Sequence, residues 1–407
     1  MNILYFHQHF STPKGSAGIR SYAMAQSLIK NGHNVTMVCG SFGNGQTGLT
    51  QSFDKGMRRG IVDNIDIIEF ELPYSNNLSF PQRIRLFLNF AIKSIGVALK
   101  ENYDIVFATT TPLTASLPGI AAKWLRGKPF VFEVRDLWPE LPKAMGVITN
   151  PVVLWLMSIL EWVSYHSADR LIGLSPGIVD GIAKRGIDRN KIATIPNGCD
   201  LDIFATTPEG WRPDGVAEND LMTIFTGTHG LANGLDAVID AASELQHRGR
   251  QDIKLVLVGN GMKKKELQKK AKELHLKNVI FHDPVDKSKL AGLMSEADLG
   301  LQILANIPAF YYGTSPNKFF DYIAAGLPVL NNYPGWLAEL IQQEDAGFTV
   351  QPEDPSEFAD ALEQAASNRG KLKQMGKNGQ ALAKREFDRA KLSQKFNDWV
   401  TGVKKNA

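Results

Sequence analysis

Short runs of apolar residues alternate along the chain with longer segments whose apolar positions recur at helical spacing. Such runs, bounded by glycine, proline or polar residues, predict buried strands. In the first half they are Ile3–Phe6, Val35–Cys39, Ile65–Phe70, Ile105–Ala108, Phe130–Val134, Leu171–Leu174 and Ile192–Ile195. In the second half they are Thr223–Thr226, Lys254–Val258, Val279–His282, Leu299–Ile303 and Val329–Leu330. This alternation predicts parallel sheets wound by crossover helices.

The chain of 407 residues is too long for one ordinary core. The segment 197–220, rich in Pro, Gly, Asp and Glu, is typical of a linker. We therefore expect an α/β protein with two Rossmann-like domains, residues 1–200 and 201–384, that face each other across a cleft. The helical stretch 380–404 predicts a C-terminal helix, about 385–407, that crosses back to the first domain. Ligands of such folds bind at the carboxyl ends of the strands.

The composition excludes several classes of protein. The chain is 43% hydrophobic and 21% charged, as in soluble enzymes, and its net charge of +3 is too small to indicate a nucleic-acid partner. Its two cysteines cannot form a disulfide framework, which favours a reducing compartment. Met1 leads directly into a strand, and no run of 18 apolar residues occurs, so we expect a cytoplasmic protein. The histidines and cysteines lack metal-ligand spacing, so we expect no metal.

The segment 313–330 has the strongest local signals. Ser315 followed by Pro316 predicts a helix with Ser315 as its N-cap, and Gly326 and Pro328 predict its end. A helix N-terminus presents unpaired N–H groups and the positive end of the helix dipole. It therefore suits an anion such as phosphate.

Two ionisable residues lie in that helix. Lys318, in the first turn, can supply a charge for a phosphate group, and Asp321, one turn deeper, can accept hydrogen bonds from ribose hydroxyls. Together they favour a site for a nucleoside diphosphate. The alternative is an ordinary exposed ion pair at i,i+3 spacing, which contributes roughly 0.2–0.5 kcal/mol.

Glycine-rich turns follow two other predicted strands. Gly15 and Gly18 permit close approach of a ligand, and a helix that begins near Ser16 would point its N-terminus at that ligand. Arg20 then either reaches phosphate or is a solvated helix residue. The turn 227–234 supplies donors for a diphosphate or sugar, and these are Thr228, His229 and Asn233.

The remaining strand ends carry further candidates. Gly259, Asn260 and Gly261 form a turn that lets a nucleobase approach the backbone, whereas the lysine-rich run 263–272 favours a solvated helix face. Asp136 follows the strand Phe130–Val134 beside Arg135 and Glu140. Asp136 can orient an acceptor hydroxyl or stabilise positive charge on a sugar ring, and the alternative is a capping role.

For two apolar segments, the sequence allows more than one packing partner. Residues 78–100 mix aromatic and aliphatic positions with Arg83, Arg85 and Lys93. Such a basic amphipathic helix either lies on a membrane surface or packs on its own domain. Residues 152–162, with Trp155 and Trp162, favour a core helix over an interface contact.

The order of these motifs resembles a known family. The segments are Gly15–Tyr22, Ile195–Asp200, Val258–Gly261 and Ser315–Val329. They occur in the same order in the retaining glycosyltransferases of family four, which have GT-B architecture. Within that family the chain is similar to bacterial N-acetyl-L-fucosaminyltransferases of surface-polysaccharide synthesis, through Gly15–Arg20, Arg135–Pro139 and Gly227–Gly234.

The resemblance implies a UDP-sugar donor in the C-terminal domain and a lipid-linked saccharide acceptor in the N-terminal one. It also implies retention at the anomeric carbon, no metal or cofactor, and a place at the inner face of the plasma membrane. Asp321 matches the ribose ligand, and 259–261 with Val285 match the base-side loops. The diphosphate turn is matched by Ser315, Asn317 and Lys318, and the loop that closes over the donor by 15–18.

The chain departs from the family pattern at three places. Gly313 stands where the first glutamate of the usual pair is expected, and Asp136 stands near the usual histidine. The usual Arg and Lys after the first strand of the C-terminal domain are replaced by the set at 228–233. These departures leave Lys318, Arg20 and helix dipoles as the expected sources of positive charge. They also leave two alternatives, a UDP-sugar epimerase of the same architecture and a non-catalytic partner subunit.

Overall fold

The computed structural model describes residues 1–15, 18–43, 46–74, 78–205 and 209–403. Contacts divide the chain into two compact units. The first contains 1–196, 313–315 and 390–407, and the second contains 197–312 and 316–389.

The first unit is built on an eight-stranded sheet with the order β3-β4-β2-β1-β5-β6-β7-β8. The strands are β1 (Asn2–Phe6), β2 (Asn34–Phe42), β3 (Met57–Val62), β4 (Ile65–Tyr74), β5 (Ile105–Thr109), β6 (Phe130–Val134), β7 (Arg170–Gly173) and β8 (Ile192–Thr194). Neighbours are parallel except β3 and β4, which are antiparallel. All seven strands predicted here are confirmed. Strand β3 was not predicted, because an edge strand that alternates exposed and half-buried positions has no apolar run.

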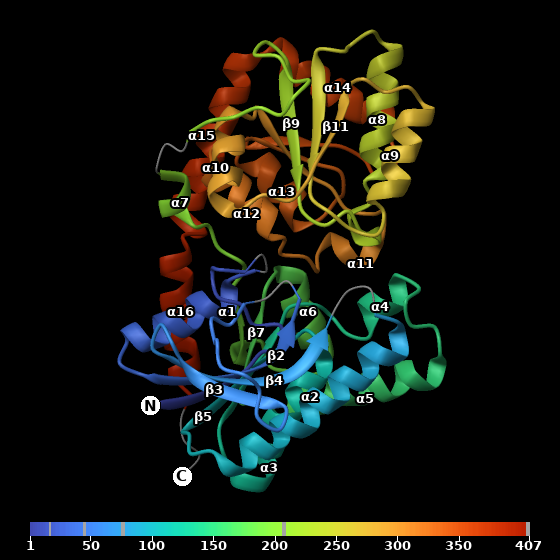
Figure 1. The fold of residues 1–407 in the computed structure, drawn as a ribbon. Helices are drawn as coiled ribbons and strands as arrows, with labels where there is room; N and C mark the ends of the chain where they lie inside the picture. Colours follow the sequence, from blue (N-terminus) through green and yellow to red (C-terminus); the bar gives the residue numbers. More distant parts are fainter. Residues whose placement is uncertain (16–17, 44–45, 75–77, 206–208, 404–407) are drawn as a thin grey trace. The chain divides into compact units, whose positions relative to one another are not determined.

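Helices cover both faces of this sheet (Figure 1). They are α1 (Arg20–Lys30), α2 (Phe80–Lys100), α3 (Leu117–Arg126), α4 (Glu140–Ala144), α5 (Pro151–Ser167), α6 (Pro176–Lys184) and α16 (Arg389–Thr401), with 3-10 turns η1 (Leu113–Ser116) and η2 (Arg189–Lys191). The C-terminal helix α16 packs on this unit. The ring centroids of Phe396 and Phe107 lie 5.0 Å apart, and the Trp399 indole donates to the Leu171 carbonyl at 3.1 Å.

The second unit has a six-stranded parallel sheet with the order β11-β10-β9-β12-β13-β14. The strands are β9 (Leu221–Thr226), β10 (Ile253–Val258), β11 (Val279–His282), β12 (Leu299–Gln302), β13 (Val329–Asn331) and β14 (Gly347–Thr349). All five predicted strands are confirmed, and the three-residue β14 was missed. Strands β10 and β11 follow on one side of β9, and β13 and β14 follow on the opposite side, beyond β12. The switch point between these two strands is where parallel sheets bind ligands.

The helices of the second unit also flank their sheet (Figure 1). They are α7 (Leu201–Ala205), α8 (Asp236–His247), α9 (Lys264–Glu273), α10 (Lys287–Glu296), α11 (Pro308–Tyr311), α12 (Asn317–Ala324), α13 (Trp336–Gln343), α14 (Pro355–Ser367) and α15 (Arg369–Glu386), with the 3-10 turn η3 (Leu231–Asn233). The predicted cap of α12 is wrong by one residue. Pro316 is the N-cap, and α12 begins at Asn317, because Pro316 has the extended φ and ψ of −75° and 128°.

Two further expectations about helices are corrected. The stretch 380–404 contains parts of two helices, since α15 ends at Glu386 and α16 begins at Arg389. Helix α1 begins at Arg20 rather than near Ser16, and Ser16 itself lies outside the described residues. Among the described residues, no helix has both the length and the apolar character needed to cross a membrane.

Candidate active site

Helix α12 is anchored at the switch point of the second sheet. Tyr322 is buried, and its hydroxyl accepts a hydrogen bond from the Thr226 amide at 3.0 Å and donates to the Ile224 carbonyl at 3.2 Å. A Cβ on Gly300 of β12 would lie 2.5 Å from the Tyr322 ring, so only glycine leaves room for that ring. This packing holds the first turn of α12 beside the carboxyl end of β9.

Lys318 lies in that first turn. Its ammonium donates to Asn233 Oδ1 at 2.7 Å and lies 4.4 Å from the centroid of the Phe225 ring, a cation–π contact. The Asn233 amide in turn donates to the Thr228 carbonyl at 2.7 Å. Burial of the ammonium lowers the pKa of Lys318 to about 7, although part of the side chain stays exposed. An anion at this place would restore the full positive charge.

His229 is completely buried behind the same turn. Neither ring nitrogen has a hydrogen-bond partner within the described residues. Burial, reinforced by the charge of Lys264, lowers the pKa of His229 to about 4, so the ring is neutral at pH 7. A buried polar ring without partners is unusual in a folded protein. Because no part of His229 is exposed, the predicted contact of its side chain with a donor would require the ring to be uncovered.

Two glycines after β10 allow the loops of this site to touch. A Cβ on Gly259 would lie 1.8 Å from the Gly227 carbonyl oxygen and 3.2 Å from His229 Nε2. A Cβ on Gly261 would lie 2.4 Å from the His229 carbonyl oxygen. The sequence predicts that these glycines let a nucleobase approach the backbone. Their observed contacts are with the neighbouring turn at 227–229.

Gly259→Ala is expected to destabilise the second unit by about 1–3 kcal/mol or more, because the added Cβ would overlap a backbone atom that cannot rotate away. The measurement is the unfolding transition followed by calorimetry. The matched control is Gly249→Ala, where φ is +73° and nothing lies within 4 Å of the added Cβ. Equal losses in the two variants would contradict a steric role for Gly259.

Lys264 departs from the expectation of a solvated lysine face. It is the first residue of α9 and is buried, and its ammonium donates to the Gly259 carbonyl at 2.8 Å, the His282 carbonyl at 3.2 Å and Asp283 Oδ1 at 2.7 Å. Lys264 therefore ties the ends of β10 and β11 together. This role of Lys264 was not predicted, since one lysine among many carries no local signal.

Asp321 faces a different set of groups from Lys318. Lys287 Nζ lies 3.9 Å from its carboxylate, and Asp200 forms ion pairs with both Lys287 and Arg389. Burial raises the pKa of Asp321 to about 6, against the opposing charge of Lys287, and the nearby Asp200 adds to the rise. The side chain is 17% exposed, so it remains open to a hydroxyl donor.

The other predicted donor-side residues lie on loops at the same edge or flank α12. Thr228 and Asn260 are exposed, and Asn260 Oδ1 accepts from the Gly261 amide at 2.8 Å. Val285 is half-buried between β11 and α10. Ser315 is half-buried, and Asn317 is the exposed first residue of α12.

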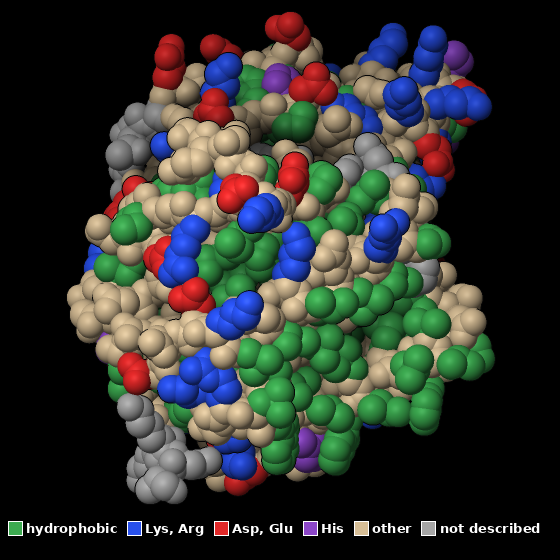
Figure 2. Space-filling view, turned by 60° about the horizontal axis from the view of Figure 1, so that its bottom comes forward, with side chains coloured by type: hydrophobic (Ala, Val, Ile, Leu, Met, Phe, Trp, Pro, Cys, Tyr) green, Lys and Arg blue, Asp and Glu red, His purple; other side chains and the backbone are tan. Residues whose placement is uncertain are grey.

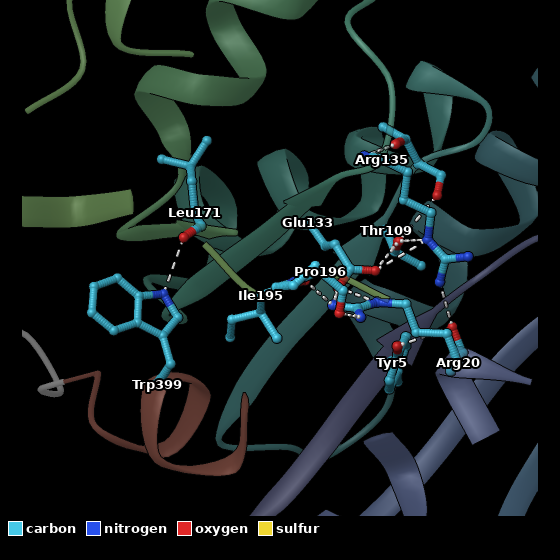
Figure 3. Close-up of polar contacts among 11 residues, drawn as sticks. Tyr5, Arg20, Thr109, Glu133, Arg135, Leu171, Ile195, Pro196 and Trp399 are labelled. Carbon is cyan, nitrogen blue, oxygen red and sulfur yellow. Dashed lines mark hydrogen bonds and ion pairs between the residues drawn. The ribbon is translucent and has the colours of Figure 1, made fainter. Parts of the chain in front are cut away.

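In the first unit, the ionisable residues gather at the carboxyl ends of β1, β5 and β6 around Glu133 (Figure 3). Glu133 is fully buried and pairs with Arg20 at 2.8 Å and Arg135 at 3.1 Å. It also accepts from Thr109 Oγ1 at 2.8 Å. Burial alone would raise the pKa of Glu133, but the two guanidinium groups and these hydrogen bonds lower it to about 2.

Arg20 does not have the arrangement expected of a phosphate ligand. It is 3% exposed, and besides Glu133 it donates to the carbonyls of Ile195 at 2.8 Å and Pro196 at 2.6 Å (Figure 3). Its guanidinium is therefore used to join α1, β6 and the segment after β8. Glu133 was not predicted as a site residue, although a single glutamate inside the apolar strand Phe130–Val134 is a signal for a buried ion pair.

Asp136 lies just beyond β6, where a site residue is expected. Its carboxylate accepts from Thr111 Oγ1 at 3.4 Å, and the residue is half-buried. Burial raises the pKa of Asp136, while the charge of Arg135 opposes the rise. Asp136 is thus held less tightly than Glu133 and keeps acceptor capacity for a ligand hydroxyl.

The loop after β1 is only partly described. The Gly15 amide donates to the Thr12 carbonyl at 3.1 Å, and Gly18 is exposed. Ser16 lies between them, outside the described residues. In the part of the chain that the structure describes, no three His, Cys, Asp or Glu side chains gather to form a metal site.

The two halves of the chain each match a family of sugar-transferring enzymes. Residues 17–203 match Glycosyltransferase Family 4, and residues 210–382 match Glycosyl transferases group 1. The chain belongs to the GT-B glycosyltransferases. The GT-B fold expected from the sequence motifs of this glycosyltransferase is confirmed. Its two family matches follow each other along the chain, and each of its two units is built on a sheet of mostly parallel strands.

Relatives of this glycosyltransferase are distant. The uncharacterized glycosyltransferase MJ1607 of Methanocaldococcus jannaschii is 23% identical over 345 residues, which are 78% of this chain and 84% of that protein. Matches to bacterial D-inositol 3-phosphate glycosyltransferases cover about half of each of those chains. Among solved structures, HepE of Anabaena in complex with UDP aligns with 99% of this chain and 100% of its own, at a TM-score of 0.68 and 16% identity. WaaG, a glycosyltransferase involved in lipopolysaccharide biosynthesis, aligns with 98% of this chain and 100% of its own. The TM-score is 0.69 and the sequence identity is 17%.

Proposed function

We propose that this glycosyltransferase moves a sugar from a UDP-sugar to a polyprenyl-diphosphate-linked saccharide in bacterial surface-polysaccharide synthesis, with retention at the anomeric carbon. The sugar is an N-acetylated deoxyhexosamine or another N-acetylhexosamine. The observation that carries the proposal is the position of Lys318, held by Asn233 and the Phe225 ring at the switch point. A cation at a helix start is suited to a diphosphate.

The chemistry requires stabilisation of departing UDP and of a cationic sugar. Lys318 and the first amides of α12 supply positive charge for the diphosphate. The acceptor oxygen attacks the anomeric carbon from the face that UDP leaves, and a phosphate oxygen of UDP takes the acceptor's proton. A lysine with a pKa of about 7 gains full charge when the phosphate arrives, and in this proposal it does the work of a metal ion at the diphosphate.

Two comparisons support a UDP-sugar donor and a role in surface-polysaccharide synthesis. HepE was solved in complex with UDP and with UDP-glucose, and WaaG is involved in lipopolysaccharide biosynthesis. On the acceptor side, Asp136 offers a half-buried carboxylate to a saccharide hydroxyl. Helix α2 exposes Leu88, Ile92 and Arg85, which supports a membrane-bound acceptor and a peripheral location at the inner face of the plasma membrane.

The test is thermal stability of the full chain with UDP, GDP, ADP and NAD. UDP at 100 times its dissociation constant is expected to stabilise the protein by about 2.7 kcal/mol. Asp321→Ala is expected to remove most of that shift, since the ribose hydroxyls lose their charged acceptor. Asp345→Ala, a loop residue outside the site, serves as the control and should keep the shift.

Other outcomes favour other functions. A shift with GDP or ADP alone would contradict the UDP donor and keep the transferase. No shift with any nucleotide would indicate the non-catalytic partner subunit. If the chain converts a UDP-sugar into its isomer without an acceptor, it is an epimerase.

A further inference from the structure

Helix α5 of the first unit exposes an apolar stripe, whereas most of its fully buried residues are polar. The buried residues are Glu161, Ser164, Tyr165 and Ser167. The exposed large side chains recur at helical spacing, and these are Val152, Trp155, Leu156, Ile159 and Trp162. A helix that packs on a core normally shows the opposite pattern. The expectation that 152–162 is a core helix is therefore wrong for these positions.

The buried polar residues of α5 are satisfied within the unit. Ser164 Oγ donates to Ser116 Oγ at 2.8 Å, and Glu161 forms an ion pair with Arg185. These polar contacts, together with the packing of Leu160 and Tyr165 on the core, set the orientation of α5. Its apolar stripe faces outward as a consequence of these contacts, with Trp155 63% and Trp162 51% exposed.

The stripe continues onto α3. Trp124 and Leu125 are each 70% exposed, and the Trp124 indole donates to Ser167 Oγ at the end of α5 at 2.9 Å. Figure 2 shows a broad patch of hydrophobic side chains over this face of the molecule, with Lys and Arg beside it. We call the exposed apolar residues of α3 and α5 the tryptophan face, defined by Trp124, Leu125, Val152, Trp155, Leu156, Ile159 and Trp162.

The helices beside the tryptophan face are basic. Helices α2 and α3 pack together and carry six lysines and arginines and no carboxylate, namely Arg83, Arg85, Lys93, Lys100, Lys123 and Arg126. Arg126 joins the two helices by donating to the carbonyls of Ala98 at 3.0 Å and Glu101 at 2.7 Å. The only carboxylate of α5 is the buried, paired Glu161.

We propose that the tryptophan face docks this glycosyltransferase onto the surface of an anionic phospholipid bilayer. Indole rings are suited to the membrane–water interface, where one part of the ring is in apolar and one in polar surroundings. Basic side chains next to them are attracted by anionic headgroups. A second copy of the chain fits less well, because a symmetric dimer would bring together the same basic helices, which contain no carboxylate of their own. The inference deepens the proposed lipid-linked acceptor, since it names the contact that brings the enzyme to that substrate.

The test is co-sedimentation of the full chain with vesicles of phosphatidylcholine, with and without phosphatidylglycerol. Wild type should bind the phosphatidylglycerol vesicles, and added salt should weaken binding. The double variant Trp155→Gln/Trp162→Gln is expected to bind the vesicles at least about tenfold more weakly than wild type, since two exposed indoles are lost. Arg85→Gln/Lys100→Gln should weaken binding to anionic vesicles by about fivefold for each charge removed.

The matched control replaces two exposed apolar residues elsewhere, Ile61→Gln/Leu274→Gln, and should bind as wild type does. Stabilisation by UDP, measured on the tryptophan variant, shows that its donor site is intact. Vesicle binding without any UDP effect would support the docking face and contradict the proposed transfer. UDP stabilisation without vesicle binding would overturn the docking face alone.

Two further results would overturn the inference. One is equal vesicle binding by the wild type and the tryptophan variant. The other is a dimer in the absence of lipid that the tryptophan substitutions dissociate, with no binding to vesicles, which would assign the face to a second copy of the chain.

Discussion

Replacing Lys318 by alanine is expected to lower kcat for sugar transfer by about 10²–10³-fold, the cost of removing one preorganised group that stabilises developing charge. The charge on UDP grows as the sugar departs, so the ammonium interacts more strongly with the transition state than with the bound donor. The dissociation constant of the donor should therefore change less than kcat. Steady-state kinetics of UDP release, together with calorimetric UDP binding, separates the two effects.

The control for this variant is Lys265→Ala, an exposed lysine on α9 outside the site, which should leave kcat unchanged. The pH dependence offers a second readout. The pKa of Lys318 is about 7 in the free protein and should rise when a diphosphate binds, so UDP affinity should fall as pH increases above 7. In the alanine variant this fall should disappear. Equal losses of UDP affinity and kcat would mark Lys318 as a uniform binding residue.

Arg20→Ala is expected to destabilise the first unit by about 3–5 kcal/mol, because it leaves the fully buried Glu133 with one cation instead of two. For a unit of this size, the unfolding temperature should fall by roughly 6–20 °C. Differential scanning calorimetry measures the shift. Arg189→Ala is the control in the same unit, since the pair of Arg189 with Asp180 is exposed on both sides and contributes about 0–1 kcal/mol.

The pH dependence of this network has a definite sign. The folded pKa of Glu133, about 2, lies below its ordinary value of 4.5, so its stabilisation is present above pH 4.5 and is lost as pH falls towards 2. The double variant Arg20→Met/Glu133→Gln should recover much of the stability lost in Arg20→Ala, because it removes the uncompensated buried charge. If Arg20→Ala instead melts as wild type but loses UDP binding, Arg20 is a ligand residue after all.

Local patterns predicted most of the fold because a buried parallel strand needs a continuous apolar run. The strands predicted from such runs are present, as is the helix after Pro316. The missed strands lack that signal. The edge strand β3 alternates exposed and half-buried positions, and β14 has only three half-buried residues. Strand β3 is held by its pairing with β4, which follows it after a two-residue turn, and β14 is held by its pairing with β13, from which helix α13 separates it.

Charged residues were harder to interpret, since their roles depend on partners distant in sequence. Arg20 and Lys264 had the local features of solvated or ligand-binding residues, yet both are buried and joined to carbonyl oxygens. The exposure of the apolar stripe on α5 could not be predicted from the sequence for the same reason. Its sequence is apolar, and the polar contacts of Glu161 and Ser164, with the packing of Tyr165 on the core, turn the exposed stripe outward.

The sequence by itself determined the two parallel sheets, the glycine-rich turns at their carboxyl ends and the position of Lys318 at a helix start. These depend on neighbouring residues, through side-chain periodicity and the conformational limits of glycine and proline. The tertiary structure decided which charged groups face a ligand and which are used internally, because the free energy of a buried charge depends on the groups that surround it. It thereby set Lys318 and Asp136 apart from Arg20 and Glu133.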